Sequence, residues 1–81
     1  MQKRITIPCD FTQRVAVRVV QGLSLKTGAP LYGIKDNRRI NFNSILGVLS
    51  LNIKKDEIIL FESEDIDRLR QIEDILFSLR Y

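Results

Sequence analysis

The 81-residue sequence contains no histidine and only one cysteine, Cys9. Without an imidazole, the chain has no Ser-His or Cys-His nucleophile pair, no phosphohistidine and no His-ligated zinc. A single cysteine cannot form an internal disulfide, and no apolar run approaches the ~18 residues of a membrane span. These absences exclude most common catalytic constellations, so we expect a non-enzymatic protein with no metal, no cofactor and no membrane contact.

Length and charge bound the class of protein further. We expect residues 1–81 to fold as a single domain with a small core. The 13 Lys and Arg residues against 10 Asp and Glu residues give a net charge of +3, a mild excess that does not require a nucleic-acid partner. The start Met-Gln-Lys-Arg is followed by alternating residues rather than by an apolar signal core, so a reducing cytoplasm is the expected location.

The first third of the chain predicts a strand and a helix. Residues 2–8 alternate, with Ile5 and Ile7 toward the core. Residues 10–12 can cap a helix, and the apolar residues after them recur at helical spacing, although their β-branched run would also suit a strand. These apolar residues are Val15, Ala16, Val19 and Val20. We expect the helix, followed by a loop marked by Gly22, Ser24, Thr27 and Gly28.

The middle and the end of the chain predict a hairpin, a short helix, a strand and a long helix. Residues 30–35 and 38–41 flank Asp36-Asn37, which tolerates the positive φ of a tight turn. Residues 57–62 predict a fourth strand after a polar turn at 54–56. We expect Ser63 to cap the last helix and Arg80 to lie at its other end. The buried stripe of that helix would be Ile66, Leu69, Ile72, Leu76 and Leu79.

The resulting order, βαββαβα, predicts an α+β open-faced β-sandwich. Strands and helices that interleave around a central hairpin fit one four-stranded, mainly antiparallel sheet with three helices on one face.

Residues 41–51 combine a polar helix start with surplus apolar surface. Ser44 can cap the free backbone N–H groups of the first turn, where a negative charge is also favourable. The apolar residues that follow cover more than one face of so short a helix, so some of them should reach solvent or a partner. These residues are Ile45, Leu46, Val48, Leu49 and Leu51. Ile45 and Leu49 lie one helical turn apart and are either an exposed docking pair or part of the core.

The run Asn-Phe-Asn-Ser-Ile-Leu-Gly-Val-Leu-Ser-Leu at residues 41–51 resembles the regulatory-serine segment of HPr, the small phosphocarrier of the bacterial sugar phosphotransferase system. The core of that segment in the family is Ser-Ile-(Met/Leu)-Gly-(Val/Leu)-(Met/Leu)-Ser-Leu. The length and the order of elements also fit, so the resemblance covers essentially the whole chain and is close over residues 38–62. It implies the HPr fold.

The resemblance is weak where HPr carries its phosphoryl group. HPr has Gly-Ile-His-Ala-Arg-Pro-Ala at the start of its first helix, and the histidine accepts phosphate from enzyme I and passes it to sugar permease subunits. Residues 10–16 here read Asp-Phe-Thr-Gln-Arg-Val-Ala. Matching Arg14 and Ala16 places Thr12 at the histidine position, whereas a shift of one residue places Gln13 there. Neither side chain can replace the histidine, so we do not expect a histidine phosphocarrier.

A chain without the histidine but with the serine segment is similar to the catabolite-repression HPr-like proteins of bacilli, which are regulatory phosphoproteins. Their serine is phosphorylated by HPr kinase/phosphorylase, and the product binds a LacI-type transcription regulator. The resemblance implies that Ser44 is the phosphorylation site and that Arg14, Ile45 and Leu49 are partner contacts, in a monomer or weak dimer. Asn43 departs from the Lys or Arg that is common before the serine, and Phe42 is bulky.

Other functions remain open. A small basic nucleic-acid-binding module could use the sheet face and the basic corner formed by Lys35, Arg38 and Arg39, but Tyr32 alone is a poor platform for base stacking. A decayed phosphocarrier paralogue with no transfer activity is a further alternative. A nucleophilic role for Cys9 or Thr12 would require a base, which the sequence does not supply.

Overall fold

The computed structural model describes residues 1–25 and 28–79, and it contains seven elements in the predicted order. Thr27 and Arg80, to which the sequence assigns a loop and a helix end, lie outside the described residues. The helix after the first strand is confirmed despite its β-branched composition. Along the chain the elements are β1 (Gln2–Thr6), α1 (Gln13–Ser24), β2 (Tyr32–Lys35), β3 (Arg38–Asn41), α2 (Ile45–Ser50), β4 (Ile58–Glu62) and α3 (Ile66–Ser78).

The four strands form one open sheet in the order β1-β4-β2-β3, and every neighbouring pair is antiparallel. β4 therefore lies between the N-terminal strand and the central hairpin. The hairpin turn has the predicted geometry, since Asp36 and Asn37 have φ values of 51° and 65°. The α+β open-sheet architecture expected from the sequence is confirmed.

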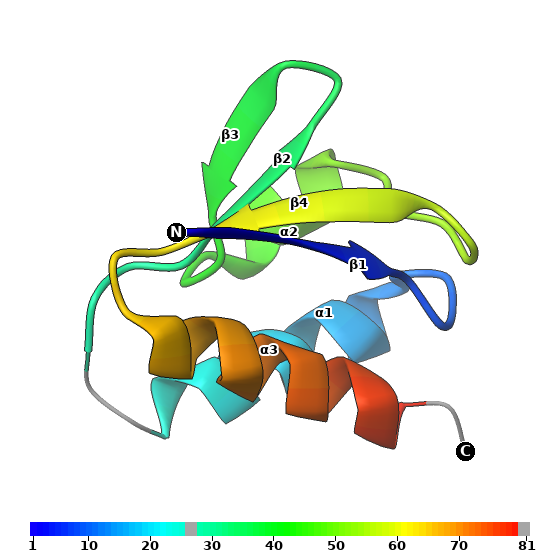
Figure 1. Cartoon of the computed structure of the whole chain (residues 1–81). Helices are drawn as coiled ribbons and strands as arrows, with labels where there is room; N and C mark the ends of the chain where they lie inside the picture. Colours follow the sequence, from blue (N-terminus) through cyan, green and yellow to red (C-terminus); the bar gives the residue numbers. More distant parts are fainter. Residues whose placement is uncertain (26–27, 80–81) are drawn as a thin grey trace.

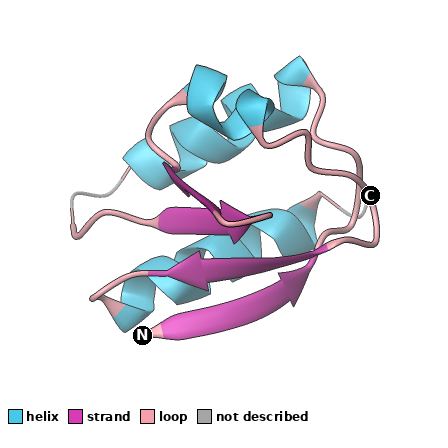
Figure 2. Ribbon diagram, turned by 90° about the horizontal axis from the view of Figure 1, so that it is seen from above, coloured by secondary structure: helices cyan, strands magenta, loops and turns pink. Residues whose placement is uncertain are grey.

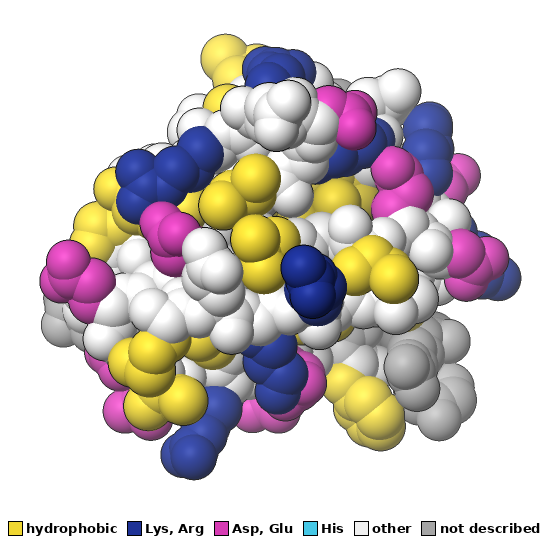
Figure 3. All heavy atoms as spheres, turned by 45° about the horizontal axis from the view of Figure 1, so that its top comes forward, with side chains coloured by type: hydrophobic (Ala, Val, Ile, Leu, Met, Phe, Trp, Pro, Cys, Tyr) yellow, Lys and Arg dark blue, Asp and Glu magenta, His cyan; other side chains and the backbone are white. Residues whose placement is uncertain are grey.

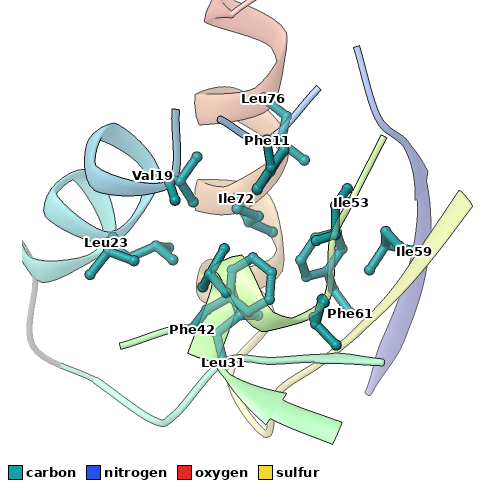
Figure 4. Close-up of a cluster of buried hydrophobic side chains, with 14 of the residues drawn as sticks. Phe11, Val19, Leu23, Leu31, Phe42, Ile53, Ile59, Phe61, Ile72 and Leu76 are labelled. Atoms are coloured by element: carbon teal, nitrogen blue, oxygen red, sulfur yellow. The ribbon is translucent and has the colours of Figure 1, made fainter. Parts of the chain in front are cut away.

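The helices pack against one side of this sheet. α1 and α3 run side by side beneath the strands, and α2 lies beside α1 near β3 (Figures 1 and 2). Within the described residues, none of the helices is long and apolar enough to cross a membrane. Figure 4 shows the core between the layers, where Val19 of α1 and Ile72 of α3 point toward Phe42 and Phe61.

Phe42 and Phe61 are the two largest fully buried side chains. Their ring centroids lie 5.2 Å apart with an interplanar angle of 82°, an edge-to-face contact. The Phe42 ring also covers Gly33 on β2, at a place where a Cβ atom would collide with it. A glycine at position 33 therefore lets the segment before α2 pack directly onto the sheet.

Two local predictions for α3 are wrong. Its N-cap is Asp65, which accepts a hydrogen bond from the backbone N–H of Asp67 at 2.9 Å. Ser63 is buried and instead accepts from the N–H of Asp65, because the chain needs two more residues to leave β4 before the helix begins. Ile66 is 47% exposed, since it is the first helical residue and precedes the turn that meets the sheet. Leu69, Ile72 and Leu76 are buried as predicted.

Replacing Gly33 with alanine tests the packing of Phe42 onto the sheet. We expect Gly33→Ala to lower the free energy of unfolding by about 1–3 kcal/mol, because the new methyl group must displace the Phe42 ring. Denaturant unfolding should show a lower midpoint with an unchanged slope. In a Phe42→Leu background the same substitution should cost less. An equal cost in both backgrounds would contradict the proposed collision.

Candidate functional site

Ser44 is the N-cap of α2, as its position in the sequence predicts. Its backbone is extended, with φ −115° and ψ 118°, and its Oγ accepts a hydrogen bond from the N–H of Gly47 at 3.1 Å. Just before it, Asn41 Oδ1 accepts from the N–H of Asn43 at 3.0 Å, which forms the turn into the helix. The Ser44 side chain is exposed, so its hydroxyl is accessible at the positive end of a short helix.

The apolar residues of α2 divide into three groups by burial. Val48 and Leu51 are fully in the core. Ile45 and Leu49 are half-buried and pack against the core, so neither of the two alternatives for this pair applies alone. Leu46 is 80% exposed. It lies two residues from Val48 and therefore on nearly the opposite face of the helix. This spacing can be read from the sequence, but Leu46 was not among the predicted partner contacts.

Thr12, Gln13 and Arg14 form the exposed start of α1. Thr12 is the N-cap, and its Oγ1 accepts a hydrogen bond from the N–H of Val15 at 3.3 Å. Within the described part of the chain, Arg14 makes no ion pair and no side-chain hydrogen bond. The candidate carrier positions are thus accessible, but they offer a capping hydroxyl and an amide rather than an imidazole.

The start of α1 lies near the end of α2, and not near Ser44. The N–H of Phe11 donates to the carbonyl of Ile53 at 2.9 Å, and Asp10 Oδ1 accepts from the N–H of Lys55 at 2.8 Å. Both contacts join the start of α1 to the segment that follows α2. The two helices run in opposite directions in Figure 1. Asn43, next to Ser44, lines a pocket with Leu23 and Ser24 at the other end of α1, so the structure does not bring Arg14 and Ser44 together. A surface that used both would extend along α2, whose six residues span about 9 Å.

The three cations of the basic corner are all engaged within the chain. Lys35 pairs with Glu57 at 3.0 Å, and Arg39 pairs with Glu62 at 2.8 Å while its guanidinium lies 3.7 Å from the centroid of the Tyr32 ring. The guanidinium of Arg38 donates to the carbonyl and to Oγ of Ser50, at 2.8 and 3.0 Å.

Electrostatics on this side of the molecule are mixed rather than strongly basic. Figure 3 shows Lys and Arg side chains interspersed with Asp and Glu over the face that includes the open side of the sheet. Nucleic-acid binding relies on unpaired basic groups and stacking aromatic rings. Because Tyr32 is covered by Arg39 and these cations already have partners, the nucleic-acid alternative loses its main support.

These pairings lower the pKa of two carboxyl groups, those of Glu57 and Glu62. A side-chain hydrogen bond from Lys35, together with one from the backbone of Lys54, lowers the pKa of Glu57 below its usual value. Side-chain hydrogen bonds from Gln2 and then Arg39 lower the pKa of Glu62.

Cys9 is half-buried. Among the residues that the structure describes, no group of three or more His, Cys, Asp or Glu side chains could hold a metal ion.

No protein-family model and no curated protein sequence matches this chain. Solved structures do match it, and those below share its fold over nearly their whole length. HPr-C-His from Thermoanaerobacter tengcongensis superposes with a TM-score of 0.86 at 22% identity, covering 99% of this chain and 94% of the other. The phosphocarrier protein HPr from Bacillus anthracis gives a TM-score of 0.78 at 27% identity, covering 94% and 92%. An HPr dimer from T. tengcongensis gives 0.74 at 23% identity, covering 98% of each chain.

Substitutions in α2 separate the capping role of Ser44 from surface exposure at Leu46. We expect Ser44→Ala to lower the free energy of unfolding by about 1 kcal/mol, because the N–H of Gly47 loses its acceptor. Ser44→Asp should retain most of the stabilisation that the Ser44 cap provides, because aspartate is also a good N-cap. Leu46→Ala should change it by less than about 0.5 kcal/mol, since the side chain is exposed. A large loss for Leu46→Ala in thermal or denaturant unfolding would contradict its placement.

The lowered pKa values of Glu57 and Glu62 predict a loss of stability in acid. A carboxyl group with a lower pKa in the folded chain stabilises the fold above its unfolded pKa of about 4.3, and this contribution disappears as the pH falls through the folded pKa. The double variant Glu57→Gln/Glu62→Gln should therefore lose less melting temperature than the wild type on acidification below that value. Glu64→Gln, which changes an exposed carboxyl group, is the control. Identical pH profiles for the wild type and the double variant would contradict the assignment.

Proposed function

We propose that this chain, which has the HPr fold and whose 27% identity to Bacillus anthracis HPr supports a relationship to the HPr family, is a non-enzymatic regulatory protein that acts by presenting α2 to a protein partner. Phosphorylation of Ser44 is the proposed switch. The observation that carries the proposal is the geometry of α2: an exposed hydroxyl caps its N-terminus, and two residues later Leu46 stands 80% exposed. A charge and an apolar anchor would then be recognised together.

The position of Ser44 suits a phosphoryl group. Phosphorylation adds about −1.5 to −2 charges at neutral pH and three strong acceptor oxygens. At the N-terminus of a helix these oxygens meet free backbone N–H groups and the positive end of the helix dipole, so the fold should tolerate the modification. The effect of the phosphate would therefore lie in recognition at the surface rather than in refolding.

A phosphocarrier role is not part of the proposal. The chain has no histidine, and neither Thr12 nor Gln13 can hold a phosphoryl group that is readily passed on. Thr12 already serves as the cap of α1. Loss of the carrier group with retention of the serine segment is the pattern that the resemblance to histidine-less HPr-like proteins implies.

The proposed partners follow from the same resemblance. An HPr kinase/phosphorylase would modify Ser44, and a LacI-type transcription regulator would bind the product, with the chain acting as a monomer or weak dimer in the ATP-containing cytoplasm. Leu46 would be the apolar centre of the contact, with the half-buried Ile45 and Leu49 at its border. Arg14, which has no ion pair among the described residues and lies near the far end of α2, would meet a carboxylate of the partner.

Incubation with an HPr kinase and ATP tests the switch. We expect intact-mass measurement to show one added phosphoryl group on the wild type and none on Ser44→Ala. Ser78→Ala, which removes another exposed hydroxyl on α3, should be modified like the wild type. If Ser44→Ala still accepts phosphate, the switch at Ser44 is refuted. If the wild type accepts none, the switch is refuted and a decayed paralogue becomes the better description.

A further inference from the structure

α2 is too short to be stable as an isolated helix. An isolated helix needs roughly 12–15 residues to be even marginally stable in water, and α2 has six. Ser44 caps its N-terminus, but its own last turn contains no basic residue. The N–H groups of Leu51 and Asn52 bond to the carbonyls of Val48 and Leu49, so it is the carbonyl of Ser50 that needs a partner from elsewhere in the chain.

β3 supplies that partner, while Lys35 of β2 donates to the carbonyl of Asn52, just beyond the helix, at 2.8 Å. The guanidinium of Arg38 donates one hydrogen bond to the carbonyl of Ser50 at 2.8 Å and a second to Ser50 Oγ at 3.0 Å. Ser50 Oγ in turn donates to the carbonyl of Gly47 at 2.6 Å. Arg38 has no carboxylate partner among the described residues. Its positive charge instead interacts favourably with the negative end of the helix dipole.

A second contact places the same strand against the middle of α2. A Cβ atom on Gly47 would lie 2.9 Å from Cγ2 of Ile40, so the side chain of Ile40 occupies the space that the glycine leaves open. Residues 38 and 40 are two positions apart on β3, so their side chains project from the same face of the strand. β3 thus holds α2 at two points, one apolar and one charged.

We infer that Arg38 is a positioning residue for the Ser44 segment: it keeps α2 folded as a helix, so that the kinase and the partner meet a preformed surface. This inference rests on the proposed function for its consequence, but its structural part can be tested without a kinase. It differs from a role in direct recognition, because the guanidinium is already occupied by the end of the helix. Removal of Arg38 should release the C-terminal turn first.

Hydrogen exchange tests the structural part. In Arg38→Ala we expect the N–H groups of Val48, Leu51 and Asn52, which are bonded within or just after α2, to exchange about fivefold faster. Exchange in the paired strands β1 and β4 should not change. Arg38→Lys, which can still reach the Ser50 carbonyl, should recover part of the protection. The matched control is Arg4→Ala, which removes an exposed arginine of β1 that forms no ion pair within residues 1–25 and 28–79.

Kinase kinetics test the consequence. If the enzyme binds the folded helix, Arg38→Ala should raise KM for the protein substrate by the inverse of the folded fraction of α2 that the exchange data give, with kcat nearly unchanged. Arg38→Lys should lie between the two, and Arg4→Ala should match the wild type. A lower KM for Arg38→Ala, or an unchanged KM in a variant whose α2 is largely unfolded by exchange, would overturn the inference, since it would mean that the kinase binds an unfolded segment.

The two arms separate the possible failures. Unchanged exchange in α2 of Arg38→Ala refutes the positioning role, whatever the kinase does. Faster exchange combined with no phosphorylation of the wild type supports the positioning role and refutes the proposed switch. In Ser50→Ala the Oγ contact is lost but the carbonyl contact remains, so we expect a smaller effect than in Arg38→Ala and little further effect in the double variant.

Discussion

The edge-to-face contact of Phe42 with Phe61 connects the segment before α2 to strand β4 of the sheet. Phe61 lies on β4, the strand that pairs with both β1 and β2, whereas Phe42 lies between β3 and the cap of α2. Gly33 leaves room for the Phe42 ring at the sheet surface. The position of Ser44, two residues after Phe42, is therefore set by packing in the core and not by the short helix itself. A rigid anchor of this kind is what a recognition surface on an exposed element requires.

The exposed start of α1 and the N-terminus of α2 lie at opposite ends of this pair of helices. The start of α1 is joined to the segment after α2, and Ser44 lies at the other end. A change of side chain at the start of α1 therefore does not touch the cap of α2. A partner that contacts both Arg14 and Ser44 must extend along α2, on which Leu46 is the most exposed apolar side chain.

Features that depend on neighbouring residues were predictable from the sequence. The caps Thr12 and Ser44 and the turn at Asp36-Asn37 follow from residue type and spacing, and the structure agrees. The cap of α3 was not predictable, because Ser63 and Asp65 are both good caps and only the direction of the chain leaving β4 decides between them.

Contacts between distant residues were also beyond the sequence. Arg38 and Ser50 are 12 positions apart, and Arg39 and Glu62 are 23 apart, so no local pattern pairs them. The sequence indicated a free basic corner, whereas the fold uses each of its cations internally. The state of Ile45 and Leu49, half-buried at the edge of the core, likewise depends on how α2 is oriented against β3 and α1.

The central claim is that Ser44 belongs to a surface switch on a fold that does not change. The most direct test is a comparison of the backbone amide NMR spectra of the protein before and after phosphorylation at Ser44. We expect shift changes confined to residues 41–52 and to the adjoining face of β3, with the amides of β1, β4 and α3 in place. Comparable changes across the whole sheet, or a loss of spectral dispersion, would contradict the claim.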